Sequence, residues 1–574
     1  MSMELIILAG LAAYANSFRG VFIFDDYIGI IENTRIRQFW PLWPWLVGTT
    51  RPLTELSFAM NYMLGGLDVR GYHVVNLTIH ILAALALFGV ARRTFLSDRL
   101  RDRHGRSAQG LALAIALIWL VHPLQVQSVT YLYQRAESLM GLCYLMTLYC
   151  VIRGAILPRS STGNAVVSTG TQRGWYLASV IWCALGMASK QVMVTAPVVV
   201  WLYDRVFLSG SWRGALRQRR GLYLGLASTW AWLALLHITA ADLTKRAQFE
   251  LGVISPLTYA VSQPGVILHY LRLSLWPNPL VLDYFWPPAR TVGAILPPTL
   301  AVLGLVVATC WALRRWPPLG FLGTCFFLLL APTSSVIPIA DLAFEHRMYL
   351  PLAAVVSLLV LGGVATLEAL LPSREHVRRG MAGGLIAVCV GLLGFGTVQR
   401  NADYQSEVAF WADTVAKRPE NPRAHNGLAH ALIYQGNFQE AVVHAARALQ
   451  LYPRYVKAHN NLGVALAGLG RYREAEIHLE EAIRLQPEVV EARINLGNVL
   501  AQQGRLEEAA AQYMEVLRFR PDLADVHNNL GNVLAQQGRL EEAAAQYMEA
   551  LRINPDLPEA RSNLELALRQ RHGT

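Results

Sequence analysis

Long apolar segments alternate with short polar loops through the first 400 residues. With their flanking residues, these segments are long enough to cross the roughly 30 Å hydrocarbon layer of a membrane as helices. The eleven segments lie near 3–17, 73–91, 109–122, 136–152, 175–189, 191–208, 221–240, 293–313, 318–332, 348–370 and 380–398. This pattern predicts an all-α, polytopic membrane helix bundle with about 11 spans.

Arginine in the loops predicts the orientation of this bundle. Cytoplasmic loops carry an excess of Lys and Arg, so we expect the arginine-rich loops to be cytoplasmic and the N-terminus inside. These loops lie at 92–106, 153–173, 205–220, 314–315 and 374–379. The assignment requires the stretch 258–276, which contains Gln263, Pro264, His269 and Arg272, to lie along the membrane surface or re-enter it. The C-terminal part of the chain is then extracytoplasmic.

A 34-residue repeat replaces the apolar pattern near the C-terminus. Pro419, Pro453, Pro487, Pro521 and Pro555 recur at this period, and so do three registers of Gly and Ala. Small residues where two helices touch, Gly at the turn and Pro after the second helix are typical of the tetratricopeptide repeat (TPR). We expect four repeats over about 422–557 and a capping helix at 558–570. The predicted organisation is a membrane domain at 1–399, a connecting helix at 400–421 and a TPR α-solenoid at 422–574.

Composition and charge narrow the functional classes. The chain is 54% hydrophobic and 16% charged, whereas soluble proteins average about 25% charged residues. This excludes a soluble enzyme, a disordered scaffold and a disulfide-rich secreted domain. Residues 401–574 carry a net charge of −4 and the rest +15, but the basic residues lie in short loops, so we expect no nucleic-acid partner. The ratio of 46 Arg to 4 Lys suggests a GC-rich bacterial genome, which would place the protein in the cytoplasmic (inner) membrane of a bacterium.

Two adjacent carboxylates stand out just after the first apolar segment. Asp25 and Asp26 lie in the stretch VFIFDDYIGIIENTRI. Acidic groups beside a membrane are costly to bury unless they have partners or a chemical role. Adjacent acids can act as a general base with a supporting group, or as metal ligands. The alternative is a solvated loop pair or a helix cap, because two aspartates alone are a weak motif.

An asparagine ladder runs through the repeats. Asn461, Asn495, Asn529 and Asn563 occupy one position of successive first helices, and first helices line the concave groove of such arrays. An amide offers both a donor and an acceptor, so the ladder suits binding a peptide backbone of any sequence. The array resembles the superhelix of O-GlcNAc transferase, whose asparagine ladder holds acceptor polypeptides. The alternative is that these asparagines are ordinary solvated groove residues.

The membrane part resembles the transmembrane and tetratricopeptide-repeat O-mannosyltransferases and their bacterial relatives, of the GT-C glycosyltransferase class. The matching stretches, in the family's order, are FIFDDYIGIIEN, RPLTELSFAMNYMLGGLDVRGYHVVNLTIHI, VHPLQVQSVTYLYQRAESL, GMASKQVMVTAPVVVWLYD, NPLVLDY, EHRMYLPLA and QRNADYQSEVAFW. The resemblance implies transfer of a sugar from a polyprenyl-phosphate-linked donor to a protein hydroxyl at the extracytoplasmic face. It also implies that the acidic pair of the first loop is catalytic.

The resemblance assigns roles at the donor site. Asp25 matches the catalytic acid of the family motif and is expected to be the base, with Asp26 supporting the acceptor or water. Transfer also needs cations for the leaving phosphate, and guanidinium groups bind phosphate bidentately. Arg51 and Arg347 are therefore the best phosphate partners, and Lys190 is the third. Each of these three could instead be an interfacial cation whose stem lies on apolar surface.

Four further positions match the family less specifically. His73 and His122 lie near the ends of apolar segments, where a histidine is more often a structural group. Glu137 is expected either to bind sugar or to pair with Arg135. Asp283 is expected to line the entrance for the acceptor.

The chain departs from the family pattern at three positions. Gln125 and Gln127 stand where the family usually has His and Glu, and Gln191 stands where a Glu is common. These departures remove ionisable groups from which a metal site or a second acid would be built. The resemblance to protein O-mannosyltransferases implies transfer without a metal, so we predict no metal site and no required cofactor. The sequence leaves open a divalent cation at Asp25 and Asp26.

Taken together, the sequence predicts a glycosyltransferase, mannosyltransferase-like, that moves a sugar from a polyprenyl-phosphate donor to Ser or Thr hydroxyls of proteins held by the TPR groove. Two other functions are compatible with the same residues. One is a GT-C enzyme acting on a glycan or lipid acceptor. The other is a non-enzymatic membrane scaffold whose repeats gather partners, although a single span would suffice to anchor such repeats.

Overall fold

The computed structural model describes residues 1–41, 45, 48–155, 169–244, 254–339 and 341–572. Helices dominate these residues and no strand occurs among them, so the predicted all-α class is confirmed. Contacts between Cα atoms divide the chain into two compact units, Met1–Phe410 and Trp411–Thr574.

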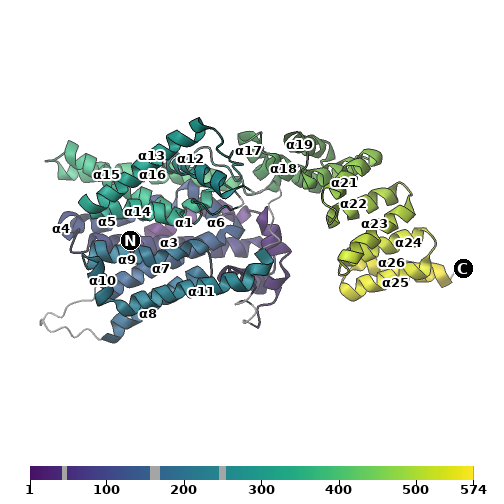
Figure 1. Ribbon diagram of the computed structural model, residues 1–574, viewed down its shortest axis with the longest axis horizontal. Helices are drawn as coiled ribbons and strands as arrows, with labels where there is room; N and C mark the ends of the chain where they lie inside the picture. Colours follow the sequence, from purple (N-terminus) through teal and green to yellow (C-terminus); the bar gives the residue numbers. More distant parts are fainter. Residues whose placement is uncertain (42–44, 46–47, 156–168, 245–253, 340, 573–574) are drawn as a thin grey trace. The chain divides into compact units, whose positions relative to one another are not determined.

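The first unit is a bundle of helices joined by short loops (Figure 1). Several of its long helices, among them α3, α7, α8 and α11, run side by side and pack in sequence on one another. Its helices are α1 Ser2–Tyr14, α2 Pro52–Gly65, α3 Val69–Phe95, α4 Arg101–His104, α5 Ala108–Leu120, α6 Val126–Val129, α7 Arg135–Ala155, α8 Thr169–Met187, α9 Ala196–Tyr203, α10 Trp212–Gln218, α11 Arg220–Thr244, α12 Pro256–Leu275, α13 Val292–Arg315, α14 Pro317–Leu330, α15 Pro351–Leu370 and α16 Glu375–Ala402.

Each of the eleven predicted apolar segments falls on a helix, but fewer helices have both the length and the hydropathy of a membrane span. Seven helical stretches in the described part of the chain have the length and hydropathy of a span, and a bent pair containing α5 brings the number to eight. The seven are α3, Leu132–Ala155, Gln191–Leu208, Arg220–Ala240, α13, α15 and α16. Helices α1 and α14 have only 13 and 14 residues, about 20 Å of helix. The chain is therefore a multi-pass membrane protein, but the predicted number of eleven spans is not confirmed.

Loops that follow alternate helices meet at the same end of the bundle. The candidate site residues of the first unit lie in one set of loops or, as His73 and Glu137 do, in the first two turns of the helices that follow them. The arginine-rich loops form the other set, although residues 156–168 of one of them lie outside the described residues. In the arginine-rich set, the Arg99 guanidinium donates to the Val206 carbonyl at 3.0 Å. In the other set, four bonds connect loops distant in sequence: Asp25 N to Tyr131 Oη, Leu53 N to Ala188 O, His346 N to Gln127 Oε1, and Gln127 Nε2 to Leu282 O.

Helix α12 covers the stretch predicted not to cross the membrane. The Tyr259 hydroxyl, near its start, donates to the Thr333 carbonyl at 2.6 Å. Near its end, the carbonyl of Ser274 lies 3.3 Å from His122 Nε2. Thr333 and His122 both belong to the loop set that holds the candidate site. Both ends of α12 therefore contact the same set of loops. Such contacts are expected of a helix that lies along one face of a bundle.

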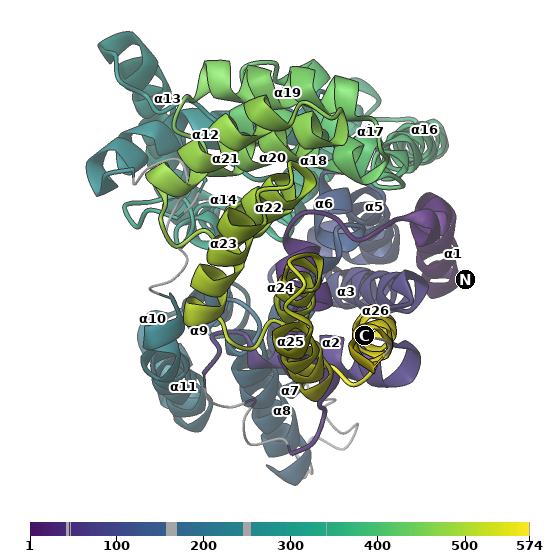
Figure 2. The ribbon, with the colours of Figure 1, turned by 90° about the vertical axis from the view of Figure 1, so that its right-hand side faces the viewer.

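The second unit is a succession of antiparallel helix pairs. In Figures 1 and 2 the pairs follow one another from α18 to α25, and α26 ends the array. The bounds are α17 Glu407–Lys417, α18 Pro422–Tyr434, α19 Phe438–Leu451, α20 Val456–Gly468, α21 Tyr472–Leu485, α22 Val490–Gln502, α23 Leu506–Phe519, α24 Ala524–Gln536, α25 Leu540–Ile553 and α26 Pro558–His572. Helix α17 begins in the first unit and ends in the second.

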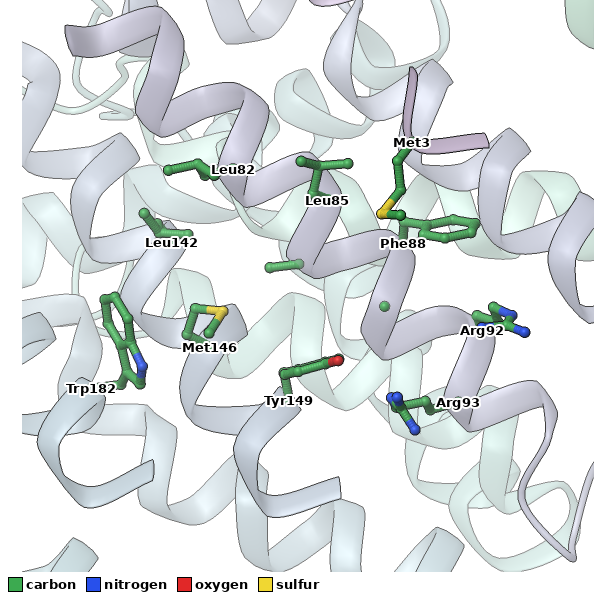
Figure 3. Close-up of a pocket in the computed structure, with 12 residues that line it drawn as sticks. Met3, Leu82, Leu85, Phe88, Arg92, Arg93, Leu142, Met146, Tyr149 and Trp182 are labelled. Carbon is green, nitrogen blue, oxygen red and sulfur yellow. The ribbon is translucent and has the colours of Figure 1, made fainter. Parts of the chain in front are cut away.

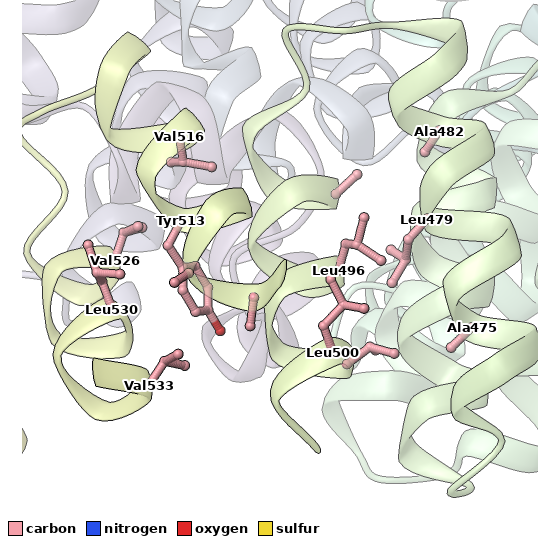
Figure 4. Close-up of a cluster of buried hydrophobic side chains, with 14 of the residues drawn as sticks. Ala475, Leu479, Ala482, Leu496, Leu500, Tyr513, Val516, Val526, Leu530 and Val533 are labelled. Atoms are coloured by element: carbon pink, nitrogen blue, oxygen red, sulfur yellow. The ribbon is translucent and has the colours of Figure 1, made fainter. Parts of the chain in front are cut away.

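The repeated small residues explain how these pairs pack. The turn glycines Gly436, Gly470, Gly504 and Gly538 have φ between +74° and +78°, a region in which a side chain is strained. A Cβ on Gly497 would lie 2.6 Å from the Tyr513 ring, so glycine lets the two helices of that repeat approach closely. Between repeats, the buried side chains form one continuous apolar core, drawn in Figure 4 from Ala475 to Val533.

Candidate active site

The Asp25–Asp26 loop is held in a strained conformation. Phe24, immediately before the pair, has φ of +48°, which is uncommon for a residue with a side chain and typical of functional sites. Asp26 is fully buried, and its carboxylate accepts from the backbone N–H of Ile23 at 3.0 Å and of Tyr133 at 2.7 Å. The Asp26 side chain thus ties the loop to the segment before α7.

Asp25 is placed differently from its neighbour. It is half-buried, and its backbone N–H donates to the Tyr131 hydroxyl at 3.0 Å. Burial raises the pKa of Asp26 well above its ordinary value, and the charge of Asp25 acts in the same direction. The two carboxylates therefore differ in environment, and the partly accessible one is Asp25.

The three predicted phosphate partners come from different loops, but the charge of each acts on the same imidazole. Burial lowers the pKa of His346 well below its ordinary value, and the charges of Lys190, Arg347 and Arg51 lower it further. The structure thus brings together three cations that are widely separated in sequence. Loop contacts explain this: Leu53 N, at the start of α2, donates to the carbonyl of Ala188 at 3.0 Å.

Arg51 has the most available guanidinium of the three cations. It is half-buried at the start of α2, and its side chain makes no hydrogen bond or ion pair with any residue in the described part of the chain. Its charge acts on the Tyr133 hydroxyl, as do those of Asp25 and Asp26. Tyr133 therefore lies within electrostatic reach of both the acidic pair and Arg51.

Lys190 and Glu137 form a buried ion pair. Their side chains are 9% and 3% exposed, with the Lys190 ammonium against a Glu137 carboxylate oxygen. The alternative partner proposed for Glu137 was Arg135, and this is wrong. Arg135 instead donates to Asn76, Ser57 and the carbonyl of Tyr72. Packing of α7 against the loop after α8 decides which cation meets Glu137.

Arg347 is the most constrained of the three cations. It is buried, and its guanidinium donates to the carbonyls of Thr333, Leu342 and Asp341 and to the Tyr259 hydroxyl. It therefore holds the loop before α15 in place and leaves fewer donors for a ligand than Arg51 does.

The two predicted histidines have different surroundings. Both ring nitrogens of His122 are engaged, since Nδ1 accepts from Leu124 N at 3.2 Å and Nε2 lies 3.3 Å from the carbonyl of Ser274. His73 is buried with no hydrogen bond on either nitrogen among the described residues. His122 thus fits the structural alternative, whereas a role in donor binding for His73 stays a prediction.

Asp283 belongs to a tightly bonded loop. Its carboxylate accepts from the N–H of Phe285 at 3.0 Å, and Phe285 has φ of +40°. Glu345 holds the same loop by accepting from Val281 N at 2.6 Å and from the Tyr284 hydroxyl at 2.9 Å. Asp283 is 3% exposed, so its expected place at an acceptor entrance stays a prediction.

Several residues of this cluster were not singled out from the sequence. They are Tyr131, Tyr133, Glu345 and His346, which bond or lie beside predicted site residues. The stretches VTYLYQRAESL and EHRMYL contain all four, so the resemblance marked the segments but not the side chains. Gln127, which stands in place of an ionisable family residue, joins two of these loops through its amide.

The asparagine ladder is bonded along the array. The side-chain amides of Asn461, Asn495 and Asn563 donate to Asn426, Asn460 and Asn528 of the preceding first helix at 2.9–3.0 Å. For Asn529 the corresponding position is Ile494, which has no polar side chain. Three of the four ladder amides therefore connect neighbouring repeats, and their hold on a peptide acceptor stays a prediction.

Within the ranges that the structure describes, no group of three or more His, Cys, Asp or Glu side chains is arranged to hold a metal ion. Both oxygens of Asp26 already accept backbone N–H groups. The expectation that no cofactor is required stays a prediction.

Comparison with known proteins bears on both units. Tetratricopeptide-repeat family models match residues 420–488, 497–538 and 531–569, which confirms the predicted repeats. The chain is 25% identical to protein O-mannosyl-transferase Tmtc3 of Drosophila melanogaster, over 78% of this chain and 54% of that protein. It is 27% identical to human protein O-mannosyl-transferase TMTC1, over 78% and 55%. The chain resembles the TMTC protein O-mannosyltransferases.

This confirms the resemblance drawn from the motifs. The TMTC-like chain spans about half the length of these curated relatives. Among solved structures, a thermophilic TPR protein of Thermus thermophilus matches 29% of this chain and 91% of its own at 24% identity, with a TM-score of 0.27. That score is too low to bear on function.

Proposed function

We propose that this TMTC-like protein is a membrane glycosyltransferase that moves a sugar, mannose by analogy with its relatives, from a polyprenyl-phosphate donor to Ser or Thr hydroxyls of proteins. The reaction takes place at the face of the membrane opposite the arginine-rich loops, which is the extracytoplasmic face of a bacterial inner membrane. The TPR array lies on that side and binds the acceptor. Similarity to protein O-mannosyltransferases over 78% of the chain supports the reaction class.

Asp25 acts as the general base. The acceptor hydroxyl oxygen forms a bond to the anomeric carbon of the donor sugar, and the bond from that carbon to the phosphate oxygen breaks. The hydroxyl proton passes to the Asp25 carboxylate, and polyprenyl phosphate leaves with the electron pair. Asp25 suits this role better than Asp26 because it is partly accessible, whereas the Asp26 oxygens are bonded to backbone N–H groups.

Cations at the same end of the bundle as the acid pair stabilise the leaving phosphate. Charge that develops on the phosphate is best met by donors already fixed in place. Arg51, with its side chain unpaired among the described residues, is the principal ligand, and Lys190 is the second. Arg347 contributes its charge while it holds the loop before α15. Asp26 is a positioning residue that keeps Asp25 in its strained loop.

The observation that carries this proposal is the arrangement around Tyr133 and the start of α2. Tyr133 N donates to the buried Asp26 beside the partly accessible Asp25, and the charge of Arg51 also acts on Tyr133. The hydrogen bond from Leu53 N to Ala188 O joins the segment after Arg51 to the segment before Lys190. Asp25→Asn keeps the shape of the side chain and removes the base, so transfer to an acceptor peptide should fall about 10²–10⁴-fold. Donor binding and thermal stability should be unchanged.

The matched control is Glu32→Gln, which removes one exposed carboxylate from the same loop. The control variant should transfer sugar at the wild-type rate, as measured by peptide mass after incubation with donor. Near-normal transfer by purified Asp25→Asn would refute the assignment of the base.

A further inference from the structure

A cavity of about 430 Å³ lies in the first unit, away from the candidate active site. Its volume is within the range of about 300–1,000 Å³ typical of small-molecule sites. Helices α3 and α7 supply most of its lining, and Met3 of α1 and Trp182 of α8 contribute as well. Figure 3 shows Leu82 and Leu142 at one end of the cavity and Arg92 and Arg93 at the other.

The lining is apolar along its length and cationic at one end. Leu85, Phe88 and Met146 lie between the two ends. Neither Arg92 nor Arg93 forms an ion pair with a carboxylate in the part of the chain that the structure describes. Arg93 instead lies over the Tyr149 ring, 5.3 Å from its centroid.

A glycine helps to shape the cationic end. A Cβ on Gly89 would lie 2.8 Å from the Tyr149 ring, so glycine at this position lets that ring approach α3 closely. The Arg93 guanidinium in turn lies over this ring. Cation–π contact of this kind orients a guanidinium without neutralising its charge.

The cavity is at the opposite end of α3 from the acid pair. His73 and Arg92 are both in α3, 19 residues apart, which corresponds to about 28 Å along a helix. That distance is close to the hydrocarbon thickness of a membrane, about 30 Å. The cationic end therefore lies at the membrane face of the arginine-rich loops, and a donor whose phosphate must reach Asp25 cannot place it at Arg92 and Arg93.

We propose that this cavity binds an anionic phospholipid of the cytoplasmic leaflet. One acyl chain lies along the apolar lining between α3 and α7, and the headgroup phosphate is held by Arg92 and Arg93. Charge complementarity selects this occupant, because a zwitterionic lipid pairs its phosphate with its own headgroup cation and would place that cation beside both guanidinium groups. The proposal concerns a site separate from the transfer reaction and does not depend on it.

Thermal unfolding of the full chain, purified in an uncharged detergent and depleted of lipid, tests this site. Phosphatidylglycerol should raise the unfolding temperature more than phosphatidylcholine with the same acyl chains. Each basic residue strengthens binding to an anionic headgroup roughly fivefold. The variant Arg92→Gln/Arg93→Gln should therefore bind phosphatidylglycerol about 30-fold more weakly and lose the preference.

Two further variants make the result specific. Arg101→Gln/Arg103→Gln removes the same charge from exposed positions outside the cavity and should keep the preference. Met146→Trp leaves both arginines in place but fills the apolar lining, and should weaken binding of long-chain phosphatidylglycerol.

Soluble glycerol phosphate should not stabilise the protein. Three results would overturn the proposal. They are equal stabilisation by the two phospholipids, an equal loss of the phosphatidylglycerol preference in Arg92→Gln/Arg93→Gln and Arg101→Gln/Arg103→Gln, or stabilisation by a polyprenyl phosphate but not by phosphatidylglycerol.

Discussion

The buried pair of Lys190 and Glu137 allows the structural and catalytic roles of one cation to be separated. Lys190→Met removes the ammonium and leaves the Glu137 carboxylate, 3% exposed, without its partner. Glu137→Gln leaves the ammonium beside the charges of Arg51 and Arg347. The double variant removes both charges and leaves neither side chain uncompensated.

The magnitudes follow from the burial of the pair. Removing one partner of a buried ion pair costs about 3–5 kcal/mol, whereas replacing both is often neutral or stabilising. Each single variant should therefore be strongly destabilised, and the double variant should recover. Activity should follow a different course. A hydrogen bond from a charged group contributes about 1.5–3 kcal/mol. If the Lys190 ammonium contacts the phosphate of the sugar donor, its loss should slow transfer about 10- to 150-fold, even in the stable double variant.

Stability in detergent and transfer to a peptide, measured on the same four preparations, decide between the roles. If Lys190 contacts the donor, the double variant should unfold like the wild type and remain slow. A double variant that recovers both stability and full transfer rate would show that the pair is only structural, and Lys190 would be removed from the donor site.

Two other predictions follow from the structure. One prediction concerns the hydrogen bonds between side-chain amides of neighbouring repeats, which are removed one at a time by Asn461→Ala, Asn495→Ala and Asn563→Ala. Each of these variants should lower the free energy of unfolding of the array in urea by about 0.5–1.5 kcal/mol. Asn529→Ala, whose partner position is Ile494, should change it by less than about 0.5 kcal/mol, and equal costs at all four positions would contradict the bonding described. The other prediction concerns the orientation of the chain in the membrane. Cysteines replacing Arg103 and His376 should be shielded from an impermeant thiol reagent in intact cells, while one replacing Gln536 should react. Labelling at position 103 would mean that the orientation is reversed.

The repeats could be predicted almost completely from the sequence. A period of 34 residues fixes where each helix begins and ends, because the Gly, Ala and Pro positions act locally. The membrane helices were located from their apolar runs, but the predicted number of eleven spans is not confirmed. Helices α1 and α14 have only 13 and 14 residues, and the apolar runs in the sequence do not show where a helix ends.

The contacts of the site could not be predicted in the same way. The partner of Glu137 is decided by the packing of α7 against the loop after α8, and the sequence neighbour Arg135 was the wrong choice. The asparagine ladder was visible from its period, but its bonds join residues 35 positions apart on neighbouring helices. Such pairings depend on tertiary distances that no local pattern encodes.

The central claim is that this protein adds sugars to other proteins outside the cytoplasm. Intact-mass measurement of extracytoplasmic proteins tests it most directly, with cells that carry the gene compared with cells that lack it and with cells that carry Asp25→Asn. The account predicts hexose increments on one or more proteins in the first cells and none in the other two. Identical masses in all three, or full increments with Asp25→Asn, would contradict it.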